Sequence, residues 1–403
     1  MHIYIKKPTI EQYQAYMLCL VFGFNMIMLT FNNLMRLVIG NTYYIDTVLM
    51  FGCYIFVAIH TLGNIGKALR IKHLLFLMMM VFLPVFTCSN GAITQKILGE
   101  QFPYCIIAFM ICLSITNYEL AWETLYKFSW IILGISMLDS FVLDLFSETS
   151  HTLGYAALFP AIIYSIEIFQ GIKNRIKNII GLILACILVV QADTAGALAA
   201  VALTMIVAMC FFIKRLKRWA FALFVAFLGT IAYCVNHVVT IAIFIADKLA
   251  LYNVRIDMLL EISKTGLTTD RFRDSIYNYC FQYAKEHMLI GCGVGNDRVL
   301  ITKNTLVRDQ TMVSNFPHNI FLEFMIQFGM ILGIVLGIVL VIFLVRYLIR
   351  EKNLYAQKIA ILLVGIGFFP FLYSSSYIEN ACFFALIGFV WKRKDCIKYQ
   401  ECS

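Results

Sequence analysis

Charged residues are scarce in this chain, and their scarcity decides its class. Only 14% of the 403 residues are charged, whereas 61% are hydrophobic and the mean hydropathy is +0.83. A water-soluble core cannot bury so much apolar surface, so the bilayer must act as a solvent for much of the chain. The sequence also lacks internal repeats, low-complexity tracts and dividing linkers, and we expect no removable signal peptide. We therefore expect one polytopic membrane domain over residues 1–403.

The usual spacings of metal and redox sites are also missing. The 13 cysteines form no CxxC pair and lie mostly in apolar segments, as small buried hydrophobic residues do. Cys280 and Cys292 are the two that lie in a long polar segment, and a disulfide between them is disfavoured because Cys280 falls within a predicted helix. The histidines show no HxH or HxxxH spacing and no acidic cluster accompanies them. We predict no metal and no cofactor.

Long apolar runs, by contrast, are abundant. A helix needs about 20 apolar residues to cross a bilayer. Candidate spans lie at 13–32, 43–62, 71–88, 102–117, 125–146, 151–170, 177–192, 195–213, 218–237, 320–348, 356–376 and 378–391. The sequence thus predicts an all-α fold of about twelve transmembrane helices.

Lysine and arginine give the orientation of these spans. With twelve spans, six basic clusters fall on the side of the N-terminus, which is then cytoplasmic, as is the C-terminus. The clusters are Lys6-Lys7, Lys67/Arg70/Lys72, Lys173/Arg175/Lys177, Lys214/Arg215/Lys217/Arg218, Arg346/Arg350/Lys352 and Lys392-Arg393-Lys394. The net charge of +9 therefore reflects membrane topology and not nucleic-acid binding.

One long polar insert, residues 238–317, interrupts the apolar runs and is extracytoplasmic in this orientation. Within it, residues 270–289 place apolar side chains at helical spacing, with Asp270 as a plausible N-cap and Gly291 as a stop. The spaced apolar residues are Phe272, Ile276, Cys280, Tyr283 and Met288. We predict an amphipathic helix near the outer membrane surface.

Two arginines, Arg271 and Arg273, open this helix. A guanidinium is suited to binding phosphate or pyrophosphate, but residues at i and i+2 do not share one helix face, so one of the two is expected to point into a site. The alternative is that both extend to the membrane interface and pair with Asp270 or Asp274.

A second polar group, Pro317-His318-Asn319, precedes the span that begins near residue 320. Histidine titrates at about pH 6.5, so His318 could accept a proton from a sugar hydroxyl. Asn319 is a reasonable N-cap, and Glu323, one turn into the span, is a functional candidate because ionisable groups at that depth are costly. The alternative roles are an interfacial polar residue for His318 and a bond to a neighbouring helix for Glu323.

Two glycine-containing turns complete the candidate set. Gly291, Gly293 and Gly295 form a GxGxG that no strand precedes, so a flexible turn allowing backbone to approach a substrate is favoured over a nucleotide site. Asn296 follows this turn. The second turn, Gln191 to Gly196, contains Thr194 and either lines a polar cavity or is simply a tight connection.

In this order, the features resemble the O-antigen ligase/polymerase family, bacterial glycosyltransferases that act on polyprenyl-pyrophosphate-linked saccharides. The similar segment runs from Arg271 to Gly333: the Arg-led helix, the glycine turn, Pro-His-Asn, Leu-Glu, Gln327-x-Gly329 and Leu332-Gly333. The resemblance implies a GT-C-like, inverting, metal-independent enzyme in the bacterial inner membrane.

The resemblance also assigns roles to residues. His318 would be the base that activates the acceptor hydroxyl, and Arg271 (or Arg273) would hold the donor pyrophosphate. Ala195 stands where the family often carries a further arginine, and Arg255 is a possible substitute. The substrate-binding set is completed by Asn319, Glu323, Gly293, Gly295, Asn296 and Thr194.

Three functions stay open at this stage. We favour a Wzy-type polysaccharide polymerase, since polymerases are the more numerous branch; the alternative is an O-antigen ligase that transfers the finished chain to lipid A core or another acceptor. A transporter or flippase is less consistent, because no half-repeat and few charged residues occur in the spans. Expected partners are an undecaprenyl-pyrophosphate-linked oligosaccharide, the bilayer, and flippase and chain-length regulator proteins, but no nucleic acid.

Overall fold

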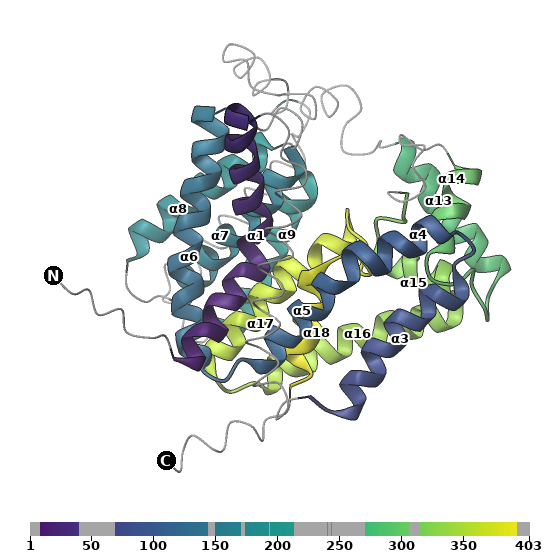
Figure 1. The fold of residues 1–403 in the computed structure, drawn as a ribbon. Coiled ribbons are helices and arrows are strands. Elements are labelled where there is room, and N and C mark those ends of the chain that lie inside the picture. Colours follow the sequence, from purple (N-terminus) through teal and green to yellow (C-terminus); the bar gives the residue numbers. More distant parts are fainter. Residues whose placement is uncertain are drawn as a thin grey trace. The chain divides into compact units, whose positions relative to one another are not determined.

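The structure, a computed structural model, describes residues 9–39, 69–143, 150–170, 174–192, 194–212, 240, 243, 271–305 and 315–392. Within these ranges the regular secondary structure is helical, without a strand (Figure 1). The all-α class predicted from the sequence is therefore confirmed. The predicted spans 43–62 and 218–237 lie outside the described residues, as do most of the insert 238–317 and Arg255 within it.

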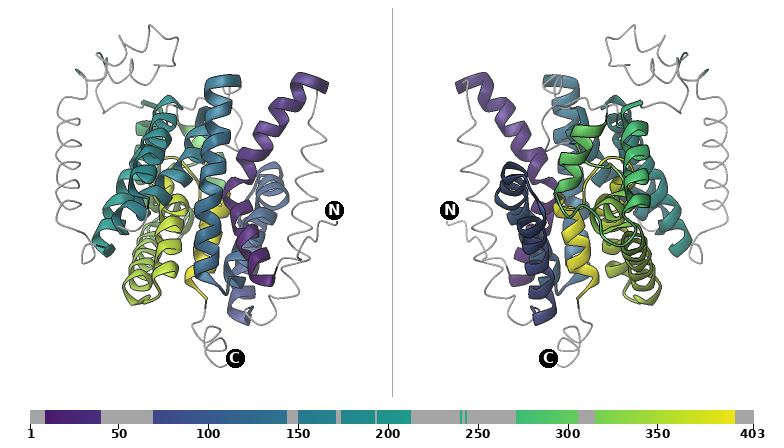
Figure 2. Two further views of the ribbon diagram at one scale, coloured as in Figure 1. Left: turned by 90° about the vertical axis from the view of Figure 1, so that its left-hand side faces the viewer. Right: turned by 90° about the vertical axis from the view of Figure 1, so that its right-hand side faces the viewer.

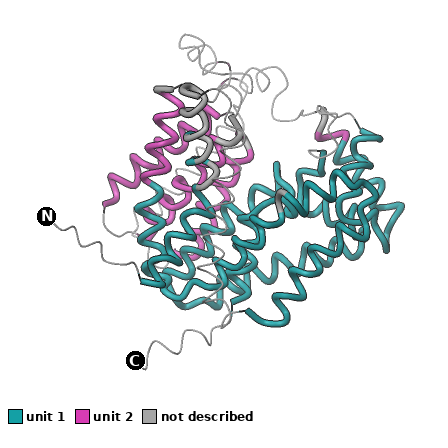
Figure 3. Tube along the Cα trace, in the orientation of Figure 1, with its two compact units in different colours: residues 1–129, 276–403 teal, residues 130–275 magenta. Residues whose placement is uncertain are grey.

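The chain divides into two compact units, residues 1–129 with 276–403, and residues 130–275 (Figure 3). The first unit is built from α1 (Ile10–Ile39), α3 (Ile71–Thr87), α4 (Gly91–Gln95), η1 (Lys96–Gln101), α5 (Phe102–Ser114), the first part of α6 (Tyr118–Leu138), most of α13 (Arg271–Glu286), α14 (Asn296–Asn304), α15 (Ile320–Phe328), α16 (Met330–Arg350), α17 (Leu354–Gly367), η6 (Phe369–Leu372) and α18 (Ala381–Val390). The chain thus returns to the first unit after its middle third.

Among the residues that the structure describes, four helical segments are long and apolar enough to cross a membrane: Gly91–Ser114, Leu153–Gln170, Met330–Arg350 and Leu354–Leu372. Shorter apolar helices occupy Ile71–Thr87, Gly196–Phe212 and Ala381–Val390. Helix covers most of every predicted span that falls within the described residues. The structure supports a helical membrane protein, whereas the count of about twelve spans stays a prediction.

In the core of the first unit, α18 packs against both α5 and α17; α18 is the yellow helix in Figure 2. α17 is buried along nearly its whole length, from Ala356 to Gly367. Aromatic rings join α18 edge to face to η6 and to α5, with centroids 5.4 Å apart for Phe371 and Phe383 and 5.9 Å apart for Phe102 and Phe384. The contact between Phe371 and Phe383 joins the two sides of the segment 373–380 that leads into α18.

The predicted single span 320–348 is wrong, because the structure breaks it into two helices. Gly329 separates α15 from α16 and adopts φ 91° and ψ 157°, a conformation that is essentially restricted to glycine. The chain then folds α15 against the start of α16, and a Cβ on Gly333 would lie 2.5 Å from the backbone of Met325. Average hydropathy does not register a single backbone conformation, so the break was invisible to the span count.

In the second unit, α7 (Ser150–Gln170) packs against α8 (Arg175–Gln191) and α9 (Ala195–Phe212). The helices approach closely at small residues: a Cβ on Gly154 would collide with the Thr194 side chain, and one on Gly181 would lie 2.7 Å from the Tyr164 ring. Thr194 is buried and donates to the Val189 carbonyl at 3.2 Å. The turn before α9 is thus a tight connection at Thr194.

Candidate functional site

The glycine turn that precedes α14 lies against the end of α15. Cys292 N and Gly293 N donate to the carbonyls of Ile326 and Gln327, both at 2.9 Å. These carbonyls end α15 and have no partner within their own helix. A Cβ on Gly291 would lie 2.4 Å from the Ile326 oxygen, and Gly293 has φ +89°. The glycines thus serve close backbone packing here, and the substrate contact expected of Gly293 and Gly295 stays a prediction.

The Asn296 side chain ties this turn to the end of α3. Its Oδ1 accepts from Ser89 N and Ser89 Oγ, both at 2.8 Å. Its Nδ2 donates to the carbonyls of Thr87 and, at 2.9 Å, Cys292. These four bonds use the amide's two donors and two acceptor sites. A substrate contact by Asn296, as predicted, would have to replace one of them.

The amphipathic helix predicted after Asp270 is confirmed as α13, although Asp270 itself lies outside the described residues. Ile276 and Cys280 on its buried face join Ile301 and Ile326 in one apolar cluster. Protein therefore covers this face from Ile276 onward. Cys292 packs against the same cluster, and both Cys280 and Cys292 are free thiols.

Arg271 and Arg273 open α13, in the part of the helix that belongs to the second unit. Arg273 is half-buried and lies within electrostatic range of the Tyr155 hydroxyl on α7. A partly buried guanidinium near a phenol is able to contact an oxyanion. The structure does not describe the side chain of Arg271.

His318 and Asn319 form the entry to α15. Asn319 Oδ1 accepts from Phe321 N at 3.0 Å and Leu322 N at 3.2 Å, which confirms the predicted N-cap. His318 has φ +52°, an uncommon left-handed conformation for a residue with a Cβ. Its Nδ1 lies 3.4 Å from the Ser374 carbonyl oxygen, and its ring centroid lies 4.3 Å from that of Phe316. The histidine is therefore held between the α15 cap and the segment 373–380.

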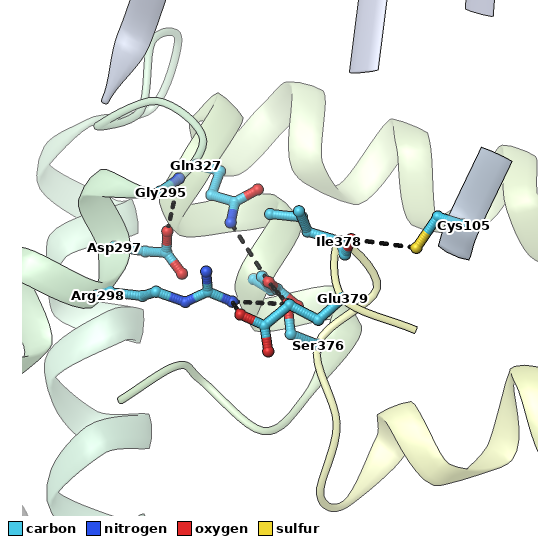
Figure 4. A network of polar contacts seen from close by, with 9 residues as sticks. Cys105, Gly295, Asp297, Arg298, Gln327, Ser376, Ile378 and Glu379 are labelled. Carbon is cyan, nitrogen blue, oxygen red and sulfur yellow. Dashed lines mark hydrogen bonds and ion pairs between the residues drawn. The ribbon is translucent and has the colours of Figure 1, made fainter. Parts of the chain in front are cut away.

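Beside this entry lies a buried network centred on Arg298 (Figure 4). Arg298 is fully buried; its Nη2 lies 2.8 Å from Glu379 Oε1, as an ion pair, and donates to Ser376 Oγ at 3.3 Å. Ser376 Oγ in turn donates to Glu323 Oε1, which also accepts from Gln327 Nε2 at 3.4 Å. The network joins α14, α15 and the segment before α18 into one polar core.

Three carboxyl groups, Asp297, Glu323 and Glu379, share the one guanidinium of Arg298 in this network. Burial raises the pKa of Glu323 to about 8, and the neighbouring Asp297 adds to the rise while Arg298 opposes it. Burial likewise raises the pKa of Asp297 and of Glu379, against the opposing effect of Arg298. α15 itself has nine residues, too few to cross a membrane. Because burial raises these pKa values, we expect the network to hold at least one proton near neutral pH.

Sequence reasoning named Glu323 but missed Asp297, Arg298, Ser376 and Glu379. Two signals could have found them. Asp297-Arg298 directly follows the glycine turn, and Glu379 lies in the polar stretch Ser374 to Asn380 between two apolar segments. An acid between two spans has to be paired or solvated, which makes it a candidate for a buried network.

The structure brings six of the predicted residues into the first unit: His318, Asn319, Glu323, Gly293, Gly295 and Asn296. Arg271, Arg273 and Thr194 belong to the second. Within the described ranges, no group of three or more histidine, cysteine or acidic side chains is arranged to hold a metal ion.

The fold and this site define a helical membrane protein with a polar centre formed around a helix that precedes one of its spans. Residues 180–337 match the family described as O-antigen ligase. The match contains α13, the glycine turn, His318 and α15, and it supports the assignment of the chain to the O-antigen ligase/polymerase family. The resemblance that these segments carry is thereby confirmed, and the family indicates a glycosyltransferase-like enzyme of O-antigen biosynthesis. No curated protein matches the chain in sequence.

Proposed function

We propose that this protein is a polysaccharide polymerase of the bacterial inner membrane, with its N-terminus in the cytoplasm. It transfers a growing glycan from polyprenyl pyrophosphate to the sugar of a lipid-linked repeat unit. One observation carries the proposal: the family match includes the His318 entry, where the structure holds the imidazole at 3.4 Å from a backbone carbonyl. A neutral histidine whose Nδ1–H donates to a carbonyl carries its lone pair on Nε2, the nitrogen that can accept a proton.

In this mechanism His318 accepts the proton of the acceptor hydroxyl as that oxygen attacks the anomeric carbon of the donor sugar. The bond from that carbon to the pyrophosphate oxygen breaks, and the electron pair leaves with the pyrophosphate. Attack opposite the leaving group inverts the anomeric configuration. Because pyrophosphate is already a good leaving group, the reaction requires no nucleotide and no metal from the protein.

In the same proposal, an arginine binds the pyrophosphate leaving group. Arg271 holds the pyrophosphate as negative charge develops on it, and Arg273 is the second candidate for this role. Electrostatic stabilisation of that charge is the main requirement of the reaction.

Glycan chain length tests the proposal. A deletion strain is complemented with wild type, His318→Ala or the matched control His287→Ala, and the glycans are resolved on a gel. His287 directly follows α13 and stacks on Tyr283 with ring centroids 3.9 Å apart, and it has no role in the proposed mechanism, so its variant should retain the ladder. We expect His318→Ala to collapse the ladder to a single repeat unit.

Two other outcomes point elsewhere. Loss of cell-attached polymer, with long chains accumulating on the lipid carrier, identifies the ligase branch of the family, which uses the same donor and a different acceptor. An unchanged glycan in the deletion strain itself overturns the proposal and returns the transporter as the explanation.

A further inference from the structure

Two serines in the segment 373–380 connect His318 to the buried network. The Ser374 carbonyl faces His318 Nδ1 at 3.4 Å, whereas the Ser376 hydroxyl, two residues later, binds Glu323 and accepts from Arg298. The Ser374 carbonyl therefore belongs to a loop that the buried side chains of Glu323 and Arg298 hold in place through Ser376.

Further contacts fix the same segment. Tyr377 OH donates to Gln327 Oε1 at 2.7 Å, and Asn319 Nδ2 donates to the Leu372 carbonyl at 3.3 Å. Phe316 adds a second route, since its ring centroid lies 4.3 Å from that of His318 and 5.6 Å from the Arg298 guanidinium carbon. Arg298 therefore reaches the surroundings of His318 from two sides.

The backbone conformation and the tautomer of His318 both depend on how firmly the Ser374 carbonyl is held. A non-glycine residue at φ +52° persists only where its surroundings over-determine it. A carbonyl accepts and cannot donate, so Nδ1 must carry the proton to bond with Ser374, and Nε2 then keeps its lone pair. Neutral histidine in water prefers the opposite tautomer, so the carbonyl has to be held in place for this one to dominate.

We propose that Glu323, Ser376 and Arg298 are positioning residues that hold the Ser374 carbonyl against His318 and thereby fix its basic tautomer. The idea rests on the proposed function, in which His318 is the base. It assigns Glu323 a role through another residue and not a direct contact with substrate, because its side chain is fully buried.

Histidine labelled with 15N in the full-length protein tests this without any substrate. Nitrogen chemical shifts distinguish the two neutral tautomers, and the spectrum of His318→Gln identifies the His318 signals. At pH 8 we expect the wild type to show the Nδ1–H form. Ser376→Ala and Glu323→Leu should show a mixture of both tautomers. Glu323→Gln keeps an oxygen acceptor for Ser376 and should resemble the wild type.

Ser375→Ala is the matched control. Its hydroxyl accepts from Asn380 Nδ2 at 3.4 Å, so it lies in the same segment but outside the Glu323 and Arg298 contacts. This variant should keep the wild-type tautomer. If Ser376→Ala, folded and inserted, also keeps it, the proposal is overturned.

Kinetics with membrane-extracted lipid-linked repeat units separate the two proposals. Ser376→Ala should lower kcat roughly tenfold to a hundredfold at nearly unchanged KM, because orientation is lost while binding is kept. The acid limb of its pH profile should move to lower pH, since the imidazolium loses an acceptor. A changed tautomer in a protein whose wild type transfers no glycan would uphold the positioning and overturn the proposed function.

Discussion

α15 and α16 follow one another in the chain but differ in what they bury and what they expose. α15 is nine residues long and buries a carboxyl group, Glu323, within a polar network. α16 has 21 residues, carries no charge before Arg346, and exposes isoleucine and valine along its length, as a helix facing lipid does. Gly329 separates them. The difference teaches that an apolar run of sequence can contain both a helix that builds a site and a helix that crosses the membrane.

Removing the positive charge of Arg298, which pairs with the buried network around Glu323 in α15, should have the largest effect on stability. Arg298→Met removes the guanidinium that the buried carboxyl groups of Asp297 and Glu323 share with Glu379, and we expect a loss of about 3 to 5 kcal/mol in the free energy of unfolding. Arg346→Met, at an exposed position of α16, should change it by less than about 0.5 kcal/mol. Thermal unfolding in detergent compares the two. Equal losses would remove the distinction between the helices.

The boundary between the two helices should be the next most sensitive point. Gly329→Ala places a Cβ 2.8 Å from Ile290 N, at a φ of +91°, and should cost about 1 to 3 kcal/mol. A Cβ added to Gly134 in α6 would meet no atom of the described residues within 4 Å, so Gly134→Ala should stabilise by about 0.4 to 1 kcal/mol. The same melting measurement applies. A neutral Gly329→Ala would mean that the chain passes from α15 to α16 without the break.

The contact between the two helices should be more tolerant than the boundary. A Cβ on Gly337 would lie 2.6 Å from the Phe321 ring, which is a side chain and can shift. We expect Gly337→Ala to cost about 1 kcal/mol. Phe321→Leu in the same chain should recover part of this loss because it opens the space. Simple additivity of the two substitutions would argue against the contact.

The pH dependence of stability gives a separate test of the comparison between the two helices. Because burial raises the pKa of Glu323 to about 8, the folded protein binds a proton there that the unfolded chain releases above its ordinary value of 4.5. Stability from this group is full below that value and is lost as pH rises toward about 8. Glu323→Gln does not titrate, so its melting temperature relative to wild type should rise from pH 5 to pH 8. A constant difference would show that Glu323 is ionised throughout.

The sequence was sufficient for the helices, the α13 face and the Asn319 cap, because each depends on local periodicity or on one capping side chain. It failed at Gly329, where one backbone conformation decides the outcome. It also could not associate Arg298 with Glu379, since their ion pair joins segments whose proximity arises from packing alone. The roles predicted for His318 and Arg271 depend on function and stay predictions.

The hydrogen bonds between the Asn296 side chain and Ser89 have a consequence for the order in which the folded structure forms during synthesis. Ser89 and Asn296 are separated by 207 positions. At a synthesis rate of 5 to 20 residues per second, about 10 to 40 s pass between the appearance of the two. During that interval Ser89 N, just after α3, cannot form its hydrogen bond with Asn296 Oδ1, because Asn296 has not yet been synthesised. The contacts of Asn296 and of the Arg298 network can therefore form only after most of the chain has been synthesised, late in its insertion into the membrane.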